Sequence, residues 1–405
     1  MGHTGETPDV AVVGGGICGL TTALALEQRG LEPTVYEAAS EYRPIGAGIL
    51  LQTNALFVFD HLGVVDRIRA EGVPLEDSQI RSPSGRVLKR FDLDRVERND
   101  FGYGYVAIHR ANLLRILLDE LNTEVETGMA CTAVTDTDTP TVRFADGTHV
   151  HPDVLVGADG IDSAVRDAVA PDVELQAMDG IVYRAIATLE LPEQYRALGF
   201  EIWGEGTYTG GAPLDSDRFY WFATAPERLA EDTTDPRETT SALRDHFATF
   251  PDPIPSVVES LDENDVIVTD LEDVPPLERW YRGSVVVAGD AAHGMLPFAG
   301  QGAAQAIEDA LALAHSIDAH ADRSAAFATY ESERKPRADR IRSESERLGR
   351  LGTMQSSIGC RARNLAFELL PDLLFRRSRR RRVSGTWLPE AAIEEHDAST
   401  RVAPD

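Results

Sequence analysis

Short apolar runs recur along the chain, and three of them lead directly into glycine-rich turns. Residues 9–13 and 31–36 have the length and composition of buried strands, and residues 20–29 between them have helical composition and end at a glycine. Two further apolar runs, 154–156 and 284–288, are each followed by small residues and a helix-compatible segment. This order predicts an α/β domain whose strands come from separate parts of the chain.

A different pattern fills the middle of the chain. Four segments rich in Tyr, Phe and Trp predict a separate antiparallel sheet, at residues 179–190, 200–203, 208–213 and 218–224. A hairpin-like turn at residues 83–85 indicates that the chain leaves the first sheet there. We therefore expect a discontinuous first domain (1–75, 101–170 and 277–350), a second sheet domain (76–100 and 171–276) and a helical, Arg-rich tail (351–405).

The turn after the first strand has the spacing of a dinucleotide-binding fingerprint. Gly14, Gly16 and Gly19 form a G-x-G-x-x-G pattern between strand and helix, and Glu37 ends the next strand roughly 20 residues later. Gly14 allows the tight turn, Gly16 lets the backbone approach a pyrophosphate, and Gly19 lets helix and strand pack closely. The Glu37 carboxylate takes the place of the group that binds an adenosine ribose, so we expect a dinucleotide site here.

Residues 289–302 (GDAAHGMLPFAGQG) form a second ligand-binding candidate. The apolar run before them delivers Asp290 at the carboxyl end of a strand, and a helix begins at the turn between Gly300 and Gly302. A helix N-terminus presents unpaired N–H groups and the positive end of a dipole. The segment therefore suits an anion or an electron-rich ring.

The charge of the chain is strongly acidic. Among 405 residues the net charge is -28, and the only lysines are Lys89 and Lys335. The acidic charge and the scarcity of lysine argue against nucleic-acid binding. They indicate adaptation to high salt, where charge repulsion is screened; the alternative is an ordinary acidic protein.

An Arg-rich run at 375–383 contrasts with the acidic composition of the rest of the chain. We expect it to pair with acidic surface of the same or a neighbouring subunit, with an anionic partner as the alternative.

The cysteines, Cys18, Cys131 and Cys360, are too few and too widely spaced for a disulfide framework or a metal site. No apolar run reaches the ~18 residues of a membrane span, and the polar N-terminus lacks the basic start of a secretory signal. We expect a cytoplasmic protein without stable membrane insertion, acting as a monomer or homodimer.

Three motifs together resemble those of the group A FAD-dependent monooxygenases, aromatic-ring hydroxylases with a p-hydroxybenzoate hydroxylase-like fold. They are residues 14–19, residues 157–166 (GADGIDSAVR) and residues 289–310. Residues 203–224 are similar to the branch that contains urate, salicylate and 3-hydroxybenzoate hydroxylases and zeaxanthin epoxidase. The resemblance implies a Rossmann-like, glutathione-reductase-type FAD-binding α/β domain, an inserted, mostly antiparallel substrate-binding sheet and a C-terminal helical region.

The resemblance also implies which residues contact FAD. Pro297, Gly300 and Gly302 would line the reacting flavin ring with their backbone, and Leu50 and the backbone from Gly46 to Gly48 would also approach the flavin. The full set of implied cofactor contacts is Gly14, Gly16, Gly19, Glu37, Ala38, Gly48, Leu50, Arg110, Cys131, Asp159, Asp290, Gly300, Gln301, Gly302 and Ala303.

The implied reaction begins with reduction of FAD by NAD(P)H. Addition of O2 then gives a flavin C4a-(hydro)peroxide, from which one oxygen atom enters a small aromatic substrate. Only one dinucleotide fingerprint is present, so NAD(P)H would bind transiently, and the choice between NADH and NADPH stays open.

Substrate contacts are expected from the second sheet. Arg184 and Tyr208 are the main candidates, and Tyr183, Tyr220 and Trp221 are further ones. Because neighbouring residues of a strand face opposite sides, at most one of Tyr220 and Trp221 lines the pocket.

Two departures from the family pattern bear on the substrate. Tyr208 stands where urate hydroxylase-like members carry Arg, which argues against urate. No His occupies residues 210–213, where hydroxybenzoate hydroxylase-like members often place a base, and His293, the nearest His to the flavin wall, is expected to be structural. This leaves room for epoxidation of an isoprenoid or polyene. The same motifs are also compatible with a flavin-dependent isoprenoid reductase and with a flavin-fold binding protein that carries no chemistry.

Overall fold

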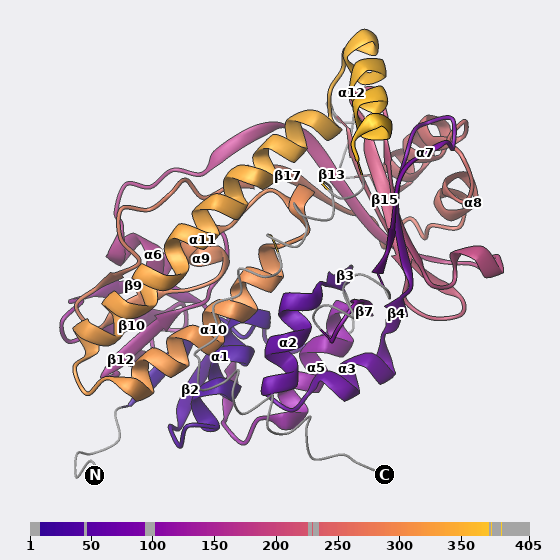
Figure 1. The fold of residues 1–405 in the computed structure, drawn as a ribbon. Helices are drawn as coiled ribbons and strands as arrows, with labels where there is room; N and C mark the ends of the chain where they lie inside the picture. The colour runs from indigo at the N-terminus through magenta and orange to yellow at the C-terminus, as the bar shows by residue number, and fades with distance from the viewer. Residues whose placement is uncertain are drawn as a thin grey trace.

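The fold was determined as a computed structural model, which describes residues 9–43, 47–93, 102–225, 229, 235–371, 374 and 382. Gly46 and all of the Arg-rich run except Arg382 lie outside these residues. Two large sheets lie side by side, and the long helix α11 (Arg323–Gly352) runs across both of them (Figure 1).

The first large sheet has six strands in the order β18-β19-β12-β1-β2-β8. β1 pairs in parallel with β2 and with β12, and β12 pairs in parallel with β19, so strands from distant parts of the chain meet as predicted. Their continuous apolar character is typical of parallel strands covered on both faces. The strands are β1 (Val10–Val13), β2 (Pro33–Glu37), β8 (Val125–Thr127), β12 (Val154–Gly157), β18 (Tyr281–Arg282) and β19 (Val285–Val287).

Helices cover this sheet. Nearly every side chain of α1 is buried, because the helix packs between the sheet and α10. The helices of this part are α1 (Ile17–Glu27), α2 (Thr53–His61), α3 (Val65–Glu71), α5 (Arg110–Glu120), α6 (Ala164–Val169), α9 (Asp290–His293) and α10 (Gly302–Ala319), with the short turn η3 (Pro297–Ala299) before α10. Two small three-stranded sheets adjoin the first large sheet. One consists of β3 (Gly48–Leu51), β7 (Tyr105–His109) and β4 (Val73–Leu75). The other consists of β9 (Cys131–Thr135), β10 (Thr141–Phe144) and β11 (His149–Val150).

The second large sheet has seven strands in the order β17-β13-β16-β15-β14-β5-β6. Its pairs are antiparallel except β14 with β5, which brings in the hairpin from before residue 100. The strands are β5 (Asp77–Arg81), β6 (Val87–Asp92), β13 (Gln176–Thr188), β14 (Leu198–Trp203), β15 (Tyr208–Pro213), β16 (Arg218–Ala225) and β17 (Ile267–Asp273).

The two faces of the second sheet have different coverings. One face forms a core with α7 (Pro236–Phe247) and α8 (Ile254–Glu259), and η2 (Glu193–Tyr195) adjoins it. The other face packs on the first part of the molecule. The helix α12 (Ser357–Leu369) projects from the top of the molecule in Figure 1. The structure thus confirms the α/β fold class with its inserted, mostly antiparallel sheet. Within the described ranges, no helix is long and apolar enough to cross a membrane.

Candidate functional site

The three fingerprint glycines, two in the turn between β1 and α1 and one in the first turn of α1, have different surroundings. A Cβ atom at Gly14, where φ is 106°, would collide with the carbonyl oxygen of Ala158, and one at Gly19 would collide with that of Gly14. A Cβ atom at Gly16 would meet only the Nη2 atom of Arg110, at 3.9 Å. Packing of the chain itself therefore requires Gly14 and Gly19, whereas Gly16 borders open space beside a guanidinium. Such a space at a helix N-terminus fits a pyrophosphate.

Glu37 ends β2, and its carboxylate is bonded to the same turn. The backbone N–H of Gly15 donates to Oε2 at 2.7 Å, and that of Ala39 donates to Oε1 at 2.8 Å. The Tyr42 hydroxyl donates to the Gly15 carbonyl at 2.9 Å. Because carboxylate oxygens accept more than one hydrogen bond, Glu37 retains the capacity to accept a ribose hydroxyl, and the adjacent Ala38 is exposed.

The second motif places Asp159 in the turn before α6, with its carboxylate at the start of that helix. The Asp159 carboxylate accepts hydrogen bonds from Ser163 Oγ and, at 3.1 Å, from the backbone N–H of Val165, and burial raises its pKa. Burial, assisted by the charge of Asp159, raises the pKa of the Cys131 thiol to about 11. Cys131 is therefore a protonated packing residue rather than a reactive thiolate.

Residues 289–302 bring a carboxylate and an exposed backbone turn together. Gly300 has a left-handed conformation (φ 61°), and Asp290, Pro297 and Gly300 are exposed. Protein nevertheless surrounds Asp290 deeply enough that desolvation raises its pKa, while the charges of Arg110 and Arg184 oppose that rise. Arg110 comes from α5, beside the open space at Gly16, and Arg184 comes from β13 of the second sheet.

The start of α10 leaves room beside this carboxylate. Outside its own helix turn, the nearest atom of the described residues to a Cβ atom at Gly302 would be Cγ of Met295 at 3.8 Å, and the Oδ1 atom of Asp290 would lie 4.0 Å away. Ala303 follows in the first turn of the helix and is half-buried. An eighteen-residue helix with an open N-terminus offers free N–H groups to a ring or an anion.

A buried amide network holds the turn at Gly300 in place. The Nε2 atom of Gln52 donates to the Gly300 carbonyl at 2.9 Å, and the Nε2 atom of Gln301 donates to Gln52 Oε1 at 2.6 Å. The Nδ2 atom of Asn54 donates to Gln301 Oε1 at 2.9 Å and to Glu308 Oε1 at 2.7 Å. The side chain of Gln301 therefore points into the protein, and its backbone is the part that can face a ligand.

Two arginines of α11 neutralise two buried carboxylates behind this network. Arg334 pairs with Glu308 at 2.5 Å and with Asp309 at 2.7 Å, and Arg337 pairs with Glu308 at 2.8 Å. The Nε2 atom of His293 donates to Asp309 Oδ2 at 2.5 Å. Desolvation by itself would raise the pKa of Asp309, but His293 and Arg334 outweigh it and hold that pKa at about 2. His293 is thus engaged in the interior, in agreement with its expected structural role.

One face of the second sheet presents aromatic rings toward the 297–302 turn. We call Tyr208, Tyr220, Phe222 and Phe298 the aromatic wall. The ring of Tyr208 lies 5.4 Å from the rings of both Phe222 and Phe298, and Tyr220 lies 5.9 Å from Phe222. Trp221 faces the opposite core, against Phe247. The expected alternation of Tyr220 and Trp221 is therefore present, with Tyr220 on the site side.

Arg184 lies on the same face of the sheet as the aromatic wall. Its Nη2 atom donates to Thr269 Oγ1 at 2.9 Å, while its buried Nε–H has no hydrogen-bond partner within the described structure. Its charge opposes the rise that burial causes in the pKa of Tyr220. Tyr183 points to the other face, where its hydroxyl accepts from the backbone N–H of Leu229. Of the two neighbouring candidates Tyr183 and Arg184, only Arg184 lies on the face that carries the aromatic wall.

The position of β3 changes one interpretation of the sequence. A Cβ atom at Gly48 would lie 2.5 Å from the Cβ atom of Tyr220, so the missing side chain makes room for this tyrosine rather than for a ligand. Leu50, on the same strand, is half-buried and packs against the aromatic part of the second sheet.

Several residues around the site could not be found from the sequence patterns. Gln52, Asn54 and Arg334 belong to no motif and are joined only by folding. Phe222 could have been found, because it lies two residues after Tyr220 on a strand whose side chains alternate. Phe298 lies inside the third motif and is buried against the sheet.

Comparison with known proteins agrees with this geometry. Residues 7–345 match the sequence model of the family described as FAD binding domain. The chain is 32% identical to the aurachin C monooxygenase/isomerase of Stigmatella aurantiaca over 374 residues, which cover 92% of this chain and 97% of the relative. It is also 32% identical to the 2-heptyl-3-hydroxy-4(1H)-quinolone synthase of Pseudomonas aeruginosa strain UCBPP-PA14 over 380 residues, covering 93% and 98%.

The three-dimensional similarity extends over most of the chain. The structure of Klebsiella pneumoniae HpxO complexed with FAD and uric acid superposes with a TM-score of 0.85 at 27% identity, covering 94% of this chain and 98% of that one. The open space at Gly16 beside Arg110, and that at Gly302 beside Asp290, fit the two ends of such a cofactor. The chain therefore belongs to the FAD binding domain family and is an FAD-dependent monooxygenase of the aromatic hydroxylase group, with a p-hydroxybenzoate hydroxylase-like fold.

Proposed function

We propose that this enzyme uses NAD(P)H and O2 to hydroxylate an aromatic ring that carries an apolar chain, of the 2-alkyl-4(1H)-quinolone class. The observation that carries the proposal is the aromatic wall, which is uncharged and has Tyr208 where a urate-type site needs a cation. An electron-rich ring with an apolar substituent suits such a surface, whereas the many polar groups of urate would lose their hydrogen bonds there. The name of the 2-heptyl-3-hydroxy-4(1H)-quinolone synthase relative points to the same chemistry.

FAD, when bound, supplies the redox and oxygen chemistry. We assign its adenosine and pyrophosphate to Gly14, Gly16, Glu37 and Arg110, and its ribityl chain and ring to Asp290 and the turn from Gly300 to Ala303. In the net reaction, two electrons from NAD(P)H and two protons convert one oxygen atom of O2 to water, and the second oxygen atom enters a ring C–H bond.

Arg184 is assigned to the substrate. Its unpaired Nε–H and its position opposite Phe222 of the aromatic wall suit a hydrogen bond to the ring oxygen of a 4-quinolone. A fixed cation there lowers the pKa of the quinolone and so favours its anionic form, whose ring attacks an electrophilic oxygen atom more readily. The wall and the closed packing behind it keep water from the reacting atoms.

The test is substrate-stimulated NAD(P)H oxidation with O2 uptake, run in molar KCl. The panel contains 2-heptyl-4(1H)-quinolone, 4(1H)-quinolone without a chain, urate, salicylate and an isoprenoid polyene. We expect the heptylquinolone to give the highest kcat/KM and a product heavier by one oxygen atom. An epoxide from the polyene as the best product would instead establish an epoxidase, and substrate reduction without O2 uptake would establish a reductase.

A further inference from the structure

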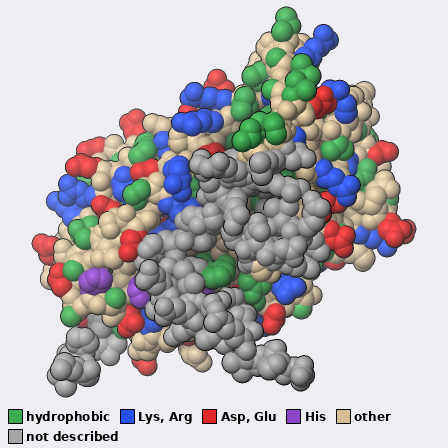
Figure 2. Space-filling model, viewed as in Figure 1, with side chains coloured by type: hydrophobic (Ala, Val, Ile, Leu, Met, Phe, Trp, Pro, Cys, Tyr) green, Lys and Arg blue, Asp and Glu red, His purple; other side chains and the backbone are tan. Residues whose placement is uncertain are grey.

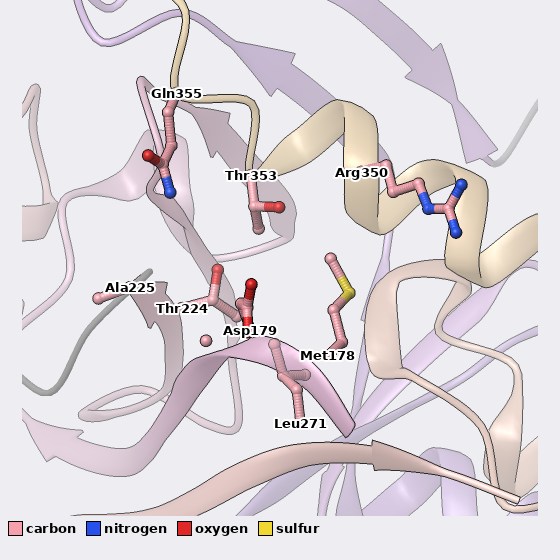
Figure 3. Close-up of a pocket in the computed structure, with 9 residues that line it drawn as sticks. Met178, Asp179, Thr224, Ala225, Leu271, Arg350, Thr353 and Gln355 are labelled. Carbon is pink, nitrogen blue, oxygen red and sulfur yellow. The ribbon is translucent and has the colours of Figure 1, made fainter. Parts of the chain in front are cut away.

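A cavity of about 230 Å³ lies between the second sheet and the C-terminal end of α11. Its apolar lining comes from Met178, Leu271 and Ala225, and Thr224 and Thr353 add methyl groups. Figure 3 shows Met178 and Leu271 on the sheet side, with Thr353 and Gln355 across the space from them. Whole ligand sites usually measure ~300–1,000 Å³, so this volume suits one part of a ligand.

The cavity continues the aromatic wall along β16. Side chains two residues apart on a strand share a face and are separated by ~6.6 Å. On this face, Tyr220 packs against Gly48, Phe222 contacts the rings of Tyr220 and Tyr208, and Thr224 lines the cavity. The cavity therefore begins one such step beyond Phe222, on the side away from β3.

Two local features of the backbone create the space. β13 has an irregular register between Met178 and Ile181, where Gly180 has a φ of 136°. On the opposite side, Gly349 and Gly352 let α11 pack closely on Phe298 and Tyr208, because a Cβ atom there would lie 2.5 Å and 3.2 Å from their rings. The helix then ends at Gly352, and the residues after it cover the cavity.

We infer that this cavity holds the distal part of the apolar chain of the substrate, while the ring lies between the aromatic wall and the flavin. The inference rests on the proposed function. Its apolar floor suits a medium-length alkyl or prenyl chain, and Met178 can adapt to the exact shape of that chain. The polar residues of the lining, Asp179, Arg350 and Gln355, would meet the chain terminus where it reaches water.

The test compares chain lengths in two variants of Met178. Met178→Trp fills the cavity, so we expect kcat/KM for 2-heptyl-4(1H)-quinolone to fall at least about tenfold through KM, with the 2-methyl compound unchanged within about twofold. Met178→Ala enlarges the cavity and should shift the preference toward longer chains. Ala177→Trp is the matched control, because Ala177 precedes Met178 on the same strand, is exposed and does not line the cavity.

Binding of both quinolones, followed by the change in flavin absorbance, separates this inference from the proposed function. If Met178→Trp binds and converts the heptyl compound as the wild type does, or loses both compounds equally, the chain does not occupy the cavity. If neither quinolone is hydroxylated but the heptyl compound binds and Met178→Trp abolishes that binding, the cavity assignment stands and the proposed reaction is wrong.

Discussion

Gly16 differs from the other two fingerprint glycines in what surrounds it. We predict that Gly16→Ala leaves the stability of the apoprotein unchanged, because its Cβ atom would enter open space, but weakens FAD binding by about tenfold or more, which is ~1.4 kcal/mol. Gly19→Ala is the control: its Cβ atom overlaps a carbonyl oxygen, which should destabilise the apoprotein by ~1–3 kcal/mol. Thermal unfolding of apoprotein and FAD titration measure the two effects, and a destabilised Gly16→Ala apoprotein would contradict the prediction.

Arg184 offers a second prediction for a single residue. Arg184→Gln should lower kcat by about 10²-fold while FAD binding is retained, because it removes a charge near the reacting ring and not a packing residue. Thr269→Val removes only the hydrogen bond that orients this guanidinium, so a smaller loss is expected. Steady-state kinetics with flavin absorbance as the measure of cofactor content tests both, and an Arg184→Gln enzyme with normal kcat would rule out the assignment.

At the scale of elements, α10 and α11 are joined by charges that no solvent reaches. Arg334→Met would leave Glu308 and Asp309 without their main partner, at an expected cost of ~3–5 kcal/mol in the free energy of unfolding. Lys335→Met, the neighbouring position, removes a pair with Asp339 near the surface and should cost less than ~1 kcal/mol. Chemical denaturation compares the two variants, and equal losses would show that the buried pairs do not hold these helices together.

The same ion pairs predict that the free energy of unfolding falls at acid pH. The pKa of Asp309 is lowered to about 2 in the folded protein, so its stabilisation is complete above the unfolded-state pKa of ~3.9 and is lost as the pH falls toward 2. The loss is on the order of 2 kcal/mol. Asp309→Asn should therefore show a flatter dependence of unfolding free energy on pH between 4 and 2. An unchanged slope would show that different carboxylates cause the loss of stability in acid.

At the scale of the whole molecule, acidic charge dominates. Figure 2 shows acidic side chains spread over the visible face, and the net charge is -28. Both lysines serve local structure, since Lys89 Nζ donates to the Leu370 carbonyl at 2.6 Å and Lys335 pairs with Asp339 at 2.9 Å. Raising KCl from 0.1 to above 1 M shortens the screening length from ~10 to ~3 Å, so we predict a higher Tm in molar KCl and loss of structure in dilute buffer. Circular dichroism checks this, and an equal gain in Tm from uncharged sucrose would exclude charge screening as the cause.

The Arg-rich run near the C-terminus can be judged at one residue. Arg382 forms an ion pair with Glu344 of α11, and its carbonyl accepts a hydrogen bond from Arg337 at 2.9 Å. This contact supports the expectation that the run pairs with acidic surface of the same chain, although the remaining arginines of the run lie outside the described residues.

Much of the fold could be predicted from local patterns. Strand, glycine turn, helix and acid follow one another between Val10 and Glu37, so the spacing alone indicates a dinucleotide site, and the order of three motifs indicates the family. The aromatic strands also predicted the second sheet, because their composition and turns are local properties of the chain.

Only the tertiary structure determined which residues surround the residues of these motifs. Gly14 and Gly16 look alike in the sequence, yet one is confined by Ala158 and the other borders open space, because a distant strand lies beside only the first. Tyr183 and Arg184 are adjacent on β13, so their side chains point to opposite faces of the sheet, and only Arg184 faces the site. The amide network, the Arg334 pairs and the cavity beside Met178 join segments far apart in the chain, and such contacts have no periodicity to reveal them. The sequence by itself therefore determined the cofactor class and the order of elements, whereas the shape of the substrate site follows from long-range packing.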